Sequence, residues 1–324
     1  MRRRAFLGLV GGAAVWPIPA RAEQQRSLPR IGYLGLGTAA DPRYEGEFLA
    51  GLRDLGYVEG KTIEIEFRFT GGDPDEVDKA AAAFVKANVD VIVTSATGVY
   101  AARRATTTIP IVMEAAGDVV AMGLAASLAH PGGNVTGSNF FLPELMAKRL
   151  ELLKEILPSM SSAGALFQRG VASTPNILEV MRAAANALVV DLSSIEVSGP
   201  EEFESAFASW AEQKVGAVVV VDIFASQSLA IAAIAAIAAK RRIASIGSFE
   251  LATAGGLIGY GADLPAMYRR AAVFVDKILK GAKPGDIPIE LATKFQTAVN
   301  LKTAKALGID IPPTLLASAK EVIE

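Results

Sequence analysis

The sequence predicts an α/β protein of two Rossmann-like lobes, each built on a parallel sheet. Short strand-like runs alternate with helical runs of ten residues or more, and this alternation occurs twice along the 324 residues. Helical crossovers of that length join parallel strands. Ala, Val, Ile and Gly are abundant, as is typical of helices packed on buried parallel strands. The chain is long enough for two such lobes, each with its own core.

The first series of elements begins after Pro29. Alternating or continuous short apolar runs indicate strands, and apolar residues three and four apart indicate helices. Gly56 is a natural C-cap for the first helix. The expected strands cover residues 30–34, 62–69, 89–94, 109–115 and 135–138, and the expected helices cover residues 43–55, 74–87, 98–106 and 119–129.

The same rhythm then repeats to form the second series. Its first helix has an apolar stripe opposite a charged face, which is typical of a helix packed on a sheet. The expected helices cover residues 143–157, 174–188, 200–213, 226–241, 264–280 and 301–307, and the expected strands cover residues 163–167, 191–197, 217–222, 244–247, 257–260 and 295–300, before a tail at Pro312-Pro313.

Residues 1–22 are interpreted as a signal peptide rather than as part of the fold. Arg2, Arg3 and Arg4 precede an apolar run that is too short to span a bilayer, and Ala20-Arg21-Ala22 resembles a cleavage site. The pattern around Arg3-Arg4 also resembles a twin-arginine signal, with ordinary Sec export as the alternative. We therefore expect a mature protein that is exported, periplasmic, soluble and not inserted in the membrane.

Charge and cysteine content exclude several classes of function. Removing residues 1–22 leaves 28 Lys and Arg against 34 Asp and Glu, a net charge of about −6, which argues against nucleic acid as a partner. The chain has no cysteine, so disulfides, thiolate metal sites and a lipidated cysteine anchor are excluded. The single histidine, His130, precedes Pro131-Gly132-Gly133 and is interpreted as a helix-end residue.

No catalytic or cofactor motif is recognisable. A Gly-x-Ser-x-Gly elbow and a phosphate loop are missing, and Gly35-Leu36-Gly37 lacks the third glycine of the dinucleotide fingerprint. We therefore predict a protein without catalytic residues, metal or cofactor.

A ligand site is expected where the two lobes face each other. In open parallel sheets, ligands bind in the crevice beyond the carboxyl ends of the strands, so the informative residues follow each strand. These residues are mostly small or polar and include several carboxylates. The candidate ligand-binding residues are Gly37, Thr38, Ser95, Ala96, Thr97, Gly117, Asp118, Phe140, Asp222, Ser248, Phe249, Glu250 and Tyr260.

This set suits a zwitterion such as an amino acid. A helix N-terminus after Thr97 or Gly98 offers N–H groups to a carboxylate, and Asp118 or Asp222 offers a partner to an ammonium group. Structural alternatives stay open at these positions. Asp118 is equally well explained as a helix N-cap, and for Asp263, before Leu264-Pro265, the N-cap is the favoured interpretation. Glu250 and Tyr260 are also explained as a first-turn acid and a core residue.

Several long blocks resemble the periplasmic tryptophan/tyrosine-type family of ABC transporter substrate-binding proteins. The match runs in order through residues 29–316. It is carried by residues 31–35 (IGYLG), 51–60 (GLRDLGYVEG), 90–94 (DVIVT), 108–112 (TIPIV), 128–137 (LAHPGGNVTG), 148–155 (KRLELLKE), 254–257 (AGGL), 260–263 (YGAD), 269–272 (RRAA) and 300–308 (NLKTAKALG).

The resemblance implies a type I periplasmic-binding-protein fold with a three-crossover hinge near residues 137–142, 261–264 and 285–294. It implies a monomeric, non-enzymatic receptor that delivers a small molecule to the membrane permease of an ABC importer. It also places ligand contacts at Gly117-Asp118 and near Phe249-Glu250. The implied lobes are residues 29–138 with 263–285, and residues 139–262 with 291–320.

Other functions remain open on the sequence. The same fold serves as a sensor subunit for a membrane signalling protein. An exported enzyme, such as a racemase or hydrolase, would use Asp118 and Asp222 as acid and base. A sugar-responsive repressor is disfavoured, because the chain has an export signal and no helix-turn-helix motif. Ser95-Ala96-Thr97-Gly98 and Gly117-Asp118-Val119 replace the family's Gly-Thr-Pro and Gly-Asp-Pro, which predicts a pocket of different shape.

Overall fold

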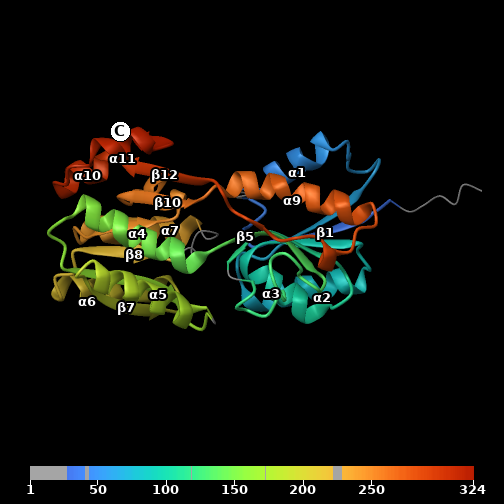
Figure 1. The fold of residues 1–324 in the computed structure, drawn as a ribbon, viewed down its shortest axis with the longest axis horizontal. Helices are drawn as coiled ribbons and strands as arrows, with labels where there is room; N and C mark the ends of the chain where they lie inside the picture. The colour runs from blue at the N-terminus through green and yellow to red at the C-terminus, as the bar shows by residue number, and fades with distance from the viewer. Residues whose placement is uncertain (1–27, 41–43, 118, 172, 222–227) are drawn as a thin grey trace, which may run out of the picture.

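The computed structural model describes residues 28–40, 44–117, 119–171, 173–221 and 228–324 (Figure 1). The chain forms two α/β lobes that lie side by side along the long axis of the molecule. Each lobe has one sheet, mostly parallel, with helices on both faces, which confirms the predicted fold class. The expected signal peptide lies outside the described residues.

The sheet of the first lobe has six parallel strands in the order β11-β5-β4-β3-β1-β2. The central strand β3 is wholly buried, whereas the edge strand β2 is only partly buried, as its alternating sequence predicts. The strands are β1 (Arg30–Gly35), β2 (Glu64–Phe69), β3 (Val91–Thr94), β4 (Ile111–Gly117), β5 (Val135–Phe140) and β11 (Glu290–Leu291).

Four helices cover the two faces of this sheet (Figure 1). Helices α2 (Pro74–Lys86) and α3 (Ala96–Ala105) pack on one face, and α1 (Glu45–Asp54) and α9 (Leu264–Leu279) pack on the other. Gly51 allows α1 and α9 to approach closely, because a Cβ there would lie 2.5 Å from the carbonyl oxygen of Arg269. Thus α9, from late in the chain, completes the core of the first lobe.

The sheet of the second lobe has seven strands in the order β13-β12-β10-β9-β8-β6-β7. Its neighbours pair in parallel except β10 and β12, which are antiparallel. The strands are β6 (Ser162–Gln168), β7 (Asp191–Val197), β8 (Ala217–Val220), β9 (Ala244–Gly247), β10 (Ile258–Ala262), β12 (Phe295–Asn300) and β13 (Glu321–Ile323).

Helices also cover both faces of the second sheet. One core includes the wholly buried Trp210, whose ring occupies the space that a side chain at Gly164 would need. The helices on that face are α6 (Phe203–Glu212), α7 (Ser228–Lys240) and α8 (Phe249–Thr253). Those on the opposite face are α4 (Leu142–Ile156), α5 (Thr174–Ala187), α10 (Leu301–Leu307) and α11 (Pro313–Ser318). Elsewhere in the chain, short 3-10 turns occur at Pro200–Glu202 and Pro284–Asp286.

The chain passes between the two sheets three times. The passages join β5 to α4, β10 to α9, and β11 to β12. They lie within the three segments that the family resemblance implied. The first sheet includes all of β5 and β11. The expected lobe boundaries at residues 138 and 291 would cut through these two strands.

The helix expected at residues 119–129 is wrong. This segment forms successive turns: the N–H groups of Leu124 and Ala125 both donate to the carbonyl of Val119, and Gly123 has φ +68°. Val119, Leu124 and Ala125 are nevertheless buried against the core of the first lobe. Burial of a turn thus produced the apolar pattern that a helix would also give. The sequence did not predict β11, α11 and β13, which are all short, and it indicated α8 only as a helical turn at Glu250.

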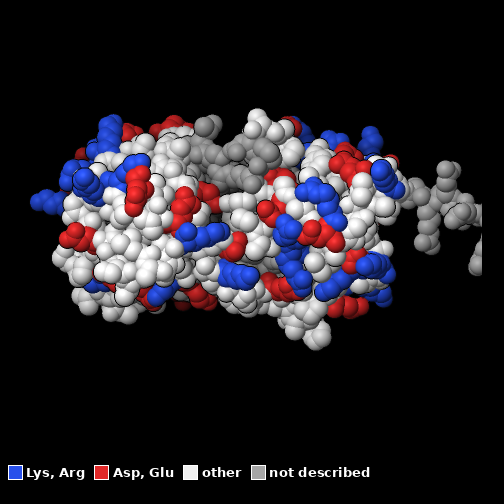
Figure 2. Space-filling model, turned by 90° about the horizontal axis from the view of Figure 1, so that it is seen from above, with Lys and Arg blue, Asp and Glu red and all other residues white. Residues whose placement is uncertain are grey.

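Charged side chains of both signs are interspersed over the face seen in Figure 2. On the α1/α9 side, Arg269 lies 3.0 Å from Glu47 and 2.5 Å from Asp54, and Arg270 lies 2.7 Å from Glu290. Such exposed pairs contribute little to stability. Within the described residues, no helix is both long and apolar enough to cross a membrane.

Candidate functional site

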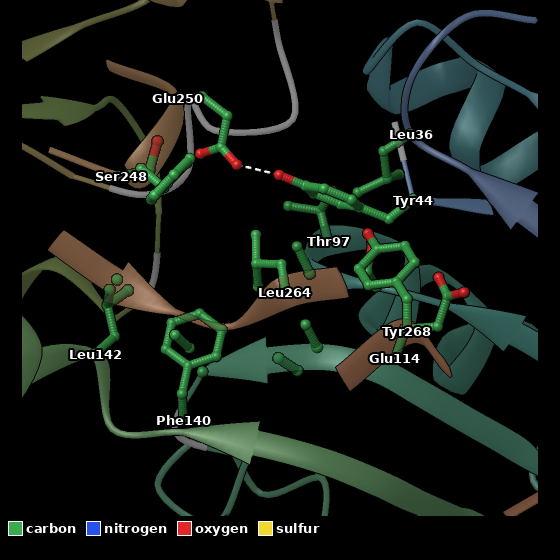
Figure 3. Close-up of a pocket in the computed structure, with 18 of the residues that line it drawn as sticks. Leu36, Tyr44, Thr97, Glu114, Phe140, Leu142, Ser248, Glu250, Leu264 and Tyr268 are labelled. Carbon is green, nitrogen blue, oxygen red and sulfur yellow. Dashed lines mark hydrogen bonds between the residues drawn. The ribbon is translucent and has the colours of Figure 1, made fainter. Parts of the chain in front are cut away.

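A cavity of about 270 Å³ lies between the two lobes. It is bordered by the carboxyl ends of strands β1, β3, β4 and β5 in the first lobe, and by the start of α8, the end of β10 and part of α4 in the second (Figure 3). This is the position expected for a ligand of an open parallel sheet. Apolar side chains supply much of its wall, among them Leu36, Phe140, Leu142 and Leu264.

Most of the described candidate residues come together around this cavity. Asp118 and Asp222 lie outside the described residues. Thr38 is exposed and does not line the cavity. The binding roles of Asp118, Asp222 and Thr38 stay predictions. The candidates that line the cavity are Gly37, Ser95, Ala96, Thr97, Gly117, Phe140, Ser248, Phe249 and Glu250.

Tyr260 also lies away from the cavity. Its ring stacks on Phe295 with 5.8 Å between ring centroids, and its carbonyl oxygen accepts a hydrogen bond of 2.8 Å from Nε of Arg149. On β10 the residues that line the cavity are Gly261 and Ala262, and Tyr260 is not among them. These contacts agree with the alternative interpretation given above, in which Tyr260 is a core residue.

The N-terminus of α3 forms part of the wall of the first lobe. Ser95 is its N-cap residue, but the Ser95 side chain does not cap the helix and instead its Oγ accepts a hydrogen bond of 3.1 Å from the hydroxyl of Tyr268. Ala96 has φ +41°, a left-handed conformation that is unfavourable for a residue other than glycine. Strain of this kind concentrates at functional sites. The N-terminal N–H groups of this ten-residue helix suit an anionic group.

A buried carboxyl–phenol pair lies in the same wall and was missed by the sequence reading. Glu114 on β4 is 1% exposed, and Oε1 and Oε2 accept hydrogen bonds of 2.9 and 3.0 Å from the hydroxyl of Tyr33. Burial raises the pKa of Glu114 well above its usual range, and burial followed by the Glu114 charge raises the pKa of Tyr33. A glutamate within an otherwise apolar central strand was the signal that could have revealed it.

One tyrosine of the first lobe, Tyr44, contacts the second lobe across the cavity, and a second tyrosine, Tyr268, packs against it. The hydroxyl of Tyr44, from the first lobe, donates a hydrogen bond to Oε1 of Glu250 on α8 of the second (Figure 3). The ring of Tyr44 also packs edge-on against Tyr268, with 5.2 Å between centroids. Its backbone N–H donates to Oε2 of Glu45 at 3.1 Å. Burial, and then the Glu114 charge, raises the pKa of Tyr268 well above its usual range.

Polar groups without hydrogen-bond partners are concentrated in the wall of the second lobe. Ser248 is 5% exposed and Gln296 is 7% exposed, and both line the cavity. Oγ of Ser248, Nε2 of Gln296 and Oε2 of Glu250 are buried without a hydrogen-bond partner. Buried polar groups are normally paired, so such exceptions call for an explanation.

Carboxylates outnumber cations around the cavity. Among the described lining residues the acids are Glu45, Glu114 and Glu250, and the single cation is Lys320, whose Nζ lies 5.7 Å from the ring centre of Phe249. The described residues include no group of three potential ligands that could hold a metal ion. His130 is exposed and is not among the lining residues.

The model of the ABC transporter substrate-binding protein family matches residues 37–323, which is most of the chain. The chain belongs to this family. Members of the family are binding proteins rather than enzymes, and the interlobe cavity is the place where a protein of this fold would hold its solute.

Individual relatives agree with this assignment. A protein of Clostridioides difficile named tyrosine-binding protein is 29% identical over 264 residues, covering 81% of this chain and 75% of the relative. A Streptococcus pneumoniae ABC domain in complex with L-Trp is 26% identical with a TM-score of 0.83, over 92% of this chain and 100% of that chain. A conserved domain protein of Vibrio cholerae is 28% identical with a TM-score of 0.83, over 91% and 100%.

Proposed function

We propose that this family member is the extracytoplasmic solute-binding component of an ABC importer and holds an amino acid or related zwitterion by closure of the two lobes. The observation that carries the proposal is the cavity walled by both lobes, across which Tyr44 contacts Glu250. A solute in this position contacts both lobes only when they are closed. Binding would therefore shift the population from open to closed molecules.

The lining supports a zwitterion with an apolar body. The N-terminus of α3 suits a carboxylate, the acids suit an ammonium group, and Phe140, Leu142 and Leu264 suit a hydrocarbon or ring. Two relatives, one named tyrosine-binding protein and one in complex with L-Trp, support the same class of solute. The predicted contacts of Asp118 and Asp222 stay part of this proposal.

The rest of the physiological assignment follows from the proposed role. The protein would be exported by residues 1–22, act as a soluble periplasmic monomer without catalysis, and deliver its solute to a membrane permease. The lobes would move about the three passages between the sheets. Lobe boundaries near residues 138, 262 and 291 belong to the same proposal.

Two measurements test the proposal. Mass spectrometry of material released from freshly purified protein should detect an amino acid or a related small zwitterion, unchanged by the protein. Calorimetry of the refolded, ligand-free protein should then give a saturable heat with that compound. Failure of every standard amino acid and related zwitterion to bind would contradict the proposal, and turnover of the compound would instead support an enzyme.

A further inference from the structure

We infer that the cavity selects solutes that carry an ammonium group, that this group binds at an acidic wall formed by Glu45, Glu114 and Glu250, and that it contributes more to binding than a carboxylate on the solute does. This inference rests on the proposed function and names the class of solute that the site accepts. Glu250 was already a predicted ligand contact, whereas Glu45 and Glu114 were not predicted from the sequence.

The first argument is the balance of charge. Glu114 is 1% exposed and Glu45 is 8% exposed, and neither has a Lys or Arg partner among the ion pairs of the described residues. Lys320 lies at an exposed position and over the ring of Phe249 rather than against these acids. A buried carboxylate without a cation is unfavourable as an anion, so a positively charged solute would supply the missing partner.

The second argument is the aromatic surface beside the acids. Tyr44 and Tyr268 pack edge to face, and both line the cavity next to Glu114 and Glu250 (Figure 3). The faces of aromatic rings attract cations, and the attraction grows where water is excluded. Rings combined with carboxylates therefore favour an ammonium group over a neutral or anionic group of the same size.

The third argument comes from hydrogen bonding rather than from the balance of charge. Oγ of Ser248 and Oε2 of Glu250 lie in the same wall of the second lobe, and each is buried without a hydrogen-bond partner. Both oxygens are able to accept hydrogen bonds, and an ammonium group is a donor of up to three. An ammonium-bearing solute would satisfy groups that the protein leaves unpaired.

The position of Glu250 links recognition to closure. Glu45 and Glu114 belong to the first lobe, whereas Glu250 belongs to α8 of the second. A cation held between the lobes reduces the repulsion that builds up when Glu250 approaches the other acids. An anionic solute would add to that repulsion, so it should bind poorly even when its apolar body fits.

Matched series of ligands test the inference by calorimetry on the mature, ligand-free protein. For both tyrosine and tryptophan, the series contains the amino acid, the arylethylamine that lacks the carboxylate, and the arylpropionate that lacks the ammonium group. We expect loss of the ammonium group to weaken binding at least about tenfold more than loss of the carboxylate. Glu250→Gln should weaken the two ammonium-bearing ligands about tenfold more than it weakens the arylpropionate, whereas Glu179→Gln, on the exposed surface of α5, should change none of them.

The outcomes separate this inference from the proposed function. Arylpropionates that bind as tightly as the amino acids would overturn the inference and leave the proposed function standing, as would a Glu250→Gln protein with unaltered affinities. If no standard amino acid and no member of either series binds, the proposed function fails and this inference fails with it.

Discussion

The hydroxyl of Tyr44 donates to the carboxylate of Glu250, which lies 206 residues further along the chain and in the other lobe. Each residue follows a segment of ordinary α/β structure, and nothing in the local sequence of either indicates the other. The contact exists because both lobes present the carboxyl ends of their strands to the same cavity. It provides the most direct test of lobe closure.

Tyr44→Phe should weaken solute binding about tenfold, because a hydrogen bond to a charged group contributes about 1.5–3 kcal/mol and, in the proposed function, would form only when the lobes close. Thermal stability should change little, since the contact joins the lobes rather than either core. Calorimetry and small-angle scattering would measure affinity and closure.

Tyr57→Phe is the matched control for this variant. The Tyr57 hydroxyl donates to Oδ1 of Asp276 at 3.0 Å inside the first lobe, where burial raises its pKa to about 12. This change should lower stability and leave affinity alone. Equal affinities for Tyr44→Phe and the unmodified protein would show that the contact does not contribute to closure.

Glu114 should make the folded protein less stable as pH rises. Burial raises its pKa in the folded state above the usual 4.5, so between these two values the folded protein keeps a proton that the unfolded chain has lost. The free energy of unfolding then falls by up to about 1.4 kcal/mol per pH unit within that window. Glu114→Gln should remove this dependence.

Calorimetric melting of both proteins at about pH 5 and about pH 8 would measure this difference. Tyr33, Glu45 and Tyr268 are the neighbouring titratable groups that shape the effect. Because Gln retains hydrogen-bonding capacity, the variant should be at least as stable as the unmodified protein at the higher pH. Identical slopes for the two proteins would contradict the assignment.

Gly98→Ala should impair binding of carboxylate-bearing solutes. A Cβ at this position would collide with Oγ1 of Thr94 and lie 2.8 Å from Cδ2 of Leu34, so the N-terminus of α3 must move. Affinity for an amino acid should fall about tenfold or more, whereas an arylethylamine should lose less. A loss that is equal for both ligands would mean that α3 does not contact the carboxylate.

Gly164→Ala should destabilise the second lobe by about 1–3 kcal/mol, because its Cβ would lie 2.6 Å from the indole ring of Trp210. Gly46→Ala is the control: no atom lies within 4 Å of the added Cβ, and α1 should gain about 0.5–1 kcal/mol. Urea unfolding would measure both. A neutral Gly164→Ala would indicate that Trp210 repacks without cost.

Local hydrophobic patterns predicted most of the long elements. They failed where the buried apolar residues belong to turns rather than to a helix or strand. Alternation along β2 and the apolar stripe of α9 were sufficient, because each element buries a single face. At residues 119–129 the buried apolar residues belong to turns, and the hydrophobic pattern of a buried turn resembles that of a helix. Tyr260 was predicted at the site from its place near the end of a strand, but in the structure its ring stacks on Phe295 and it is not among the residues that line the cavity.

The sequence by itself determined the two α/β lobes, the family and the strand ends that surround the cavity, since these depend on periodicity and on order along the chain. Only the tertiary structure decided that Tyr33 pairs with Glu114, that Tyr44 contacts Glu250, and that acids outnumber cations in the wall. Those relationships join residues far apart in the chain, and their energies come from burial and charge proximity, which are properties of the packed molecule rather than of any local segment.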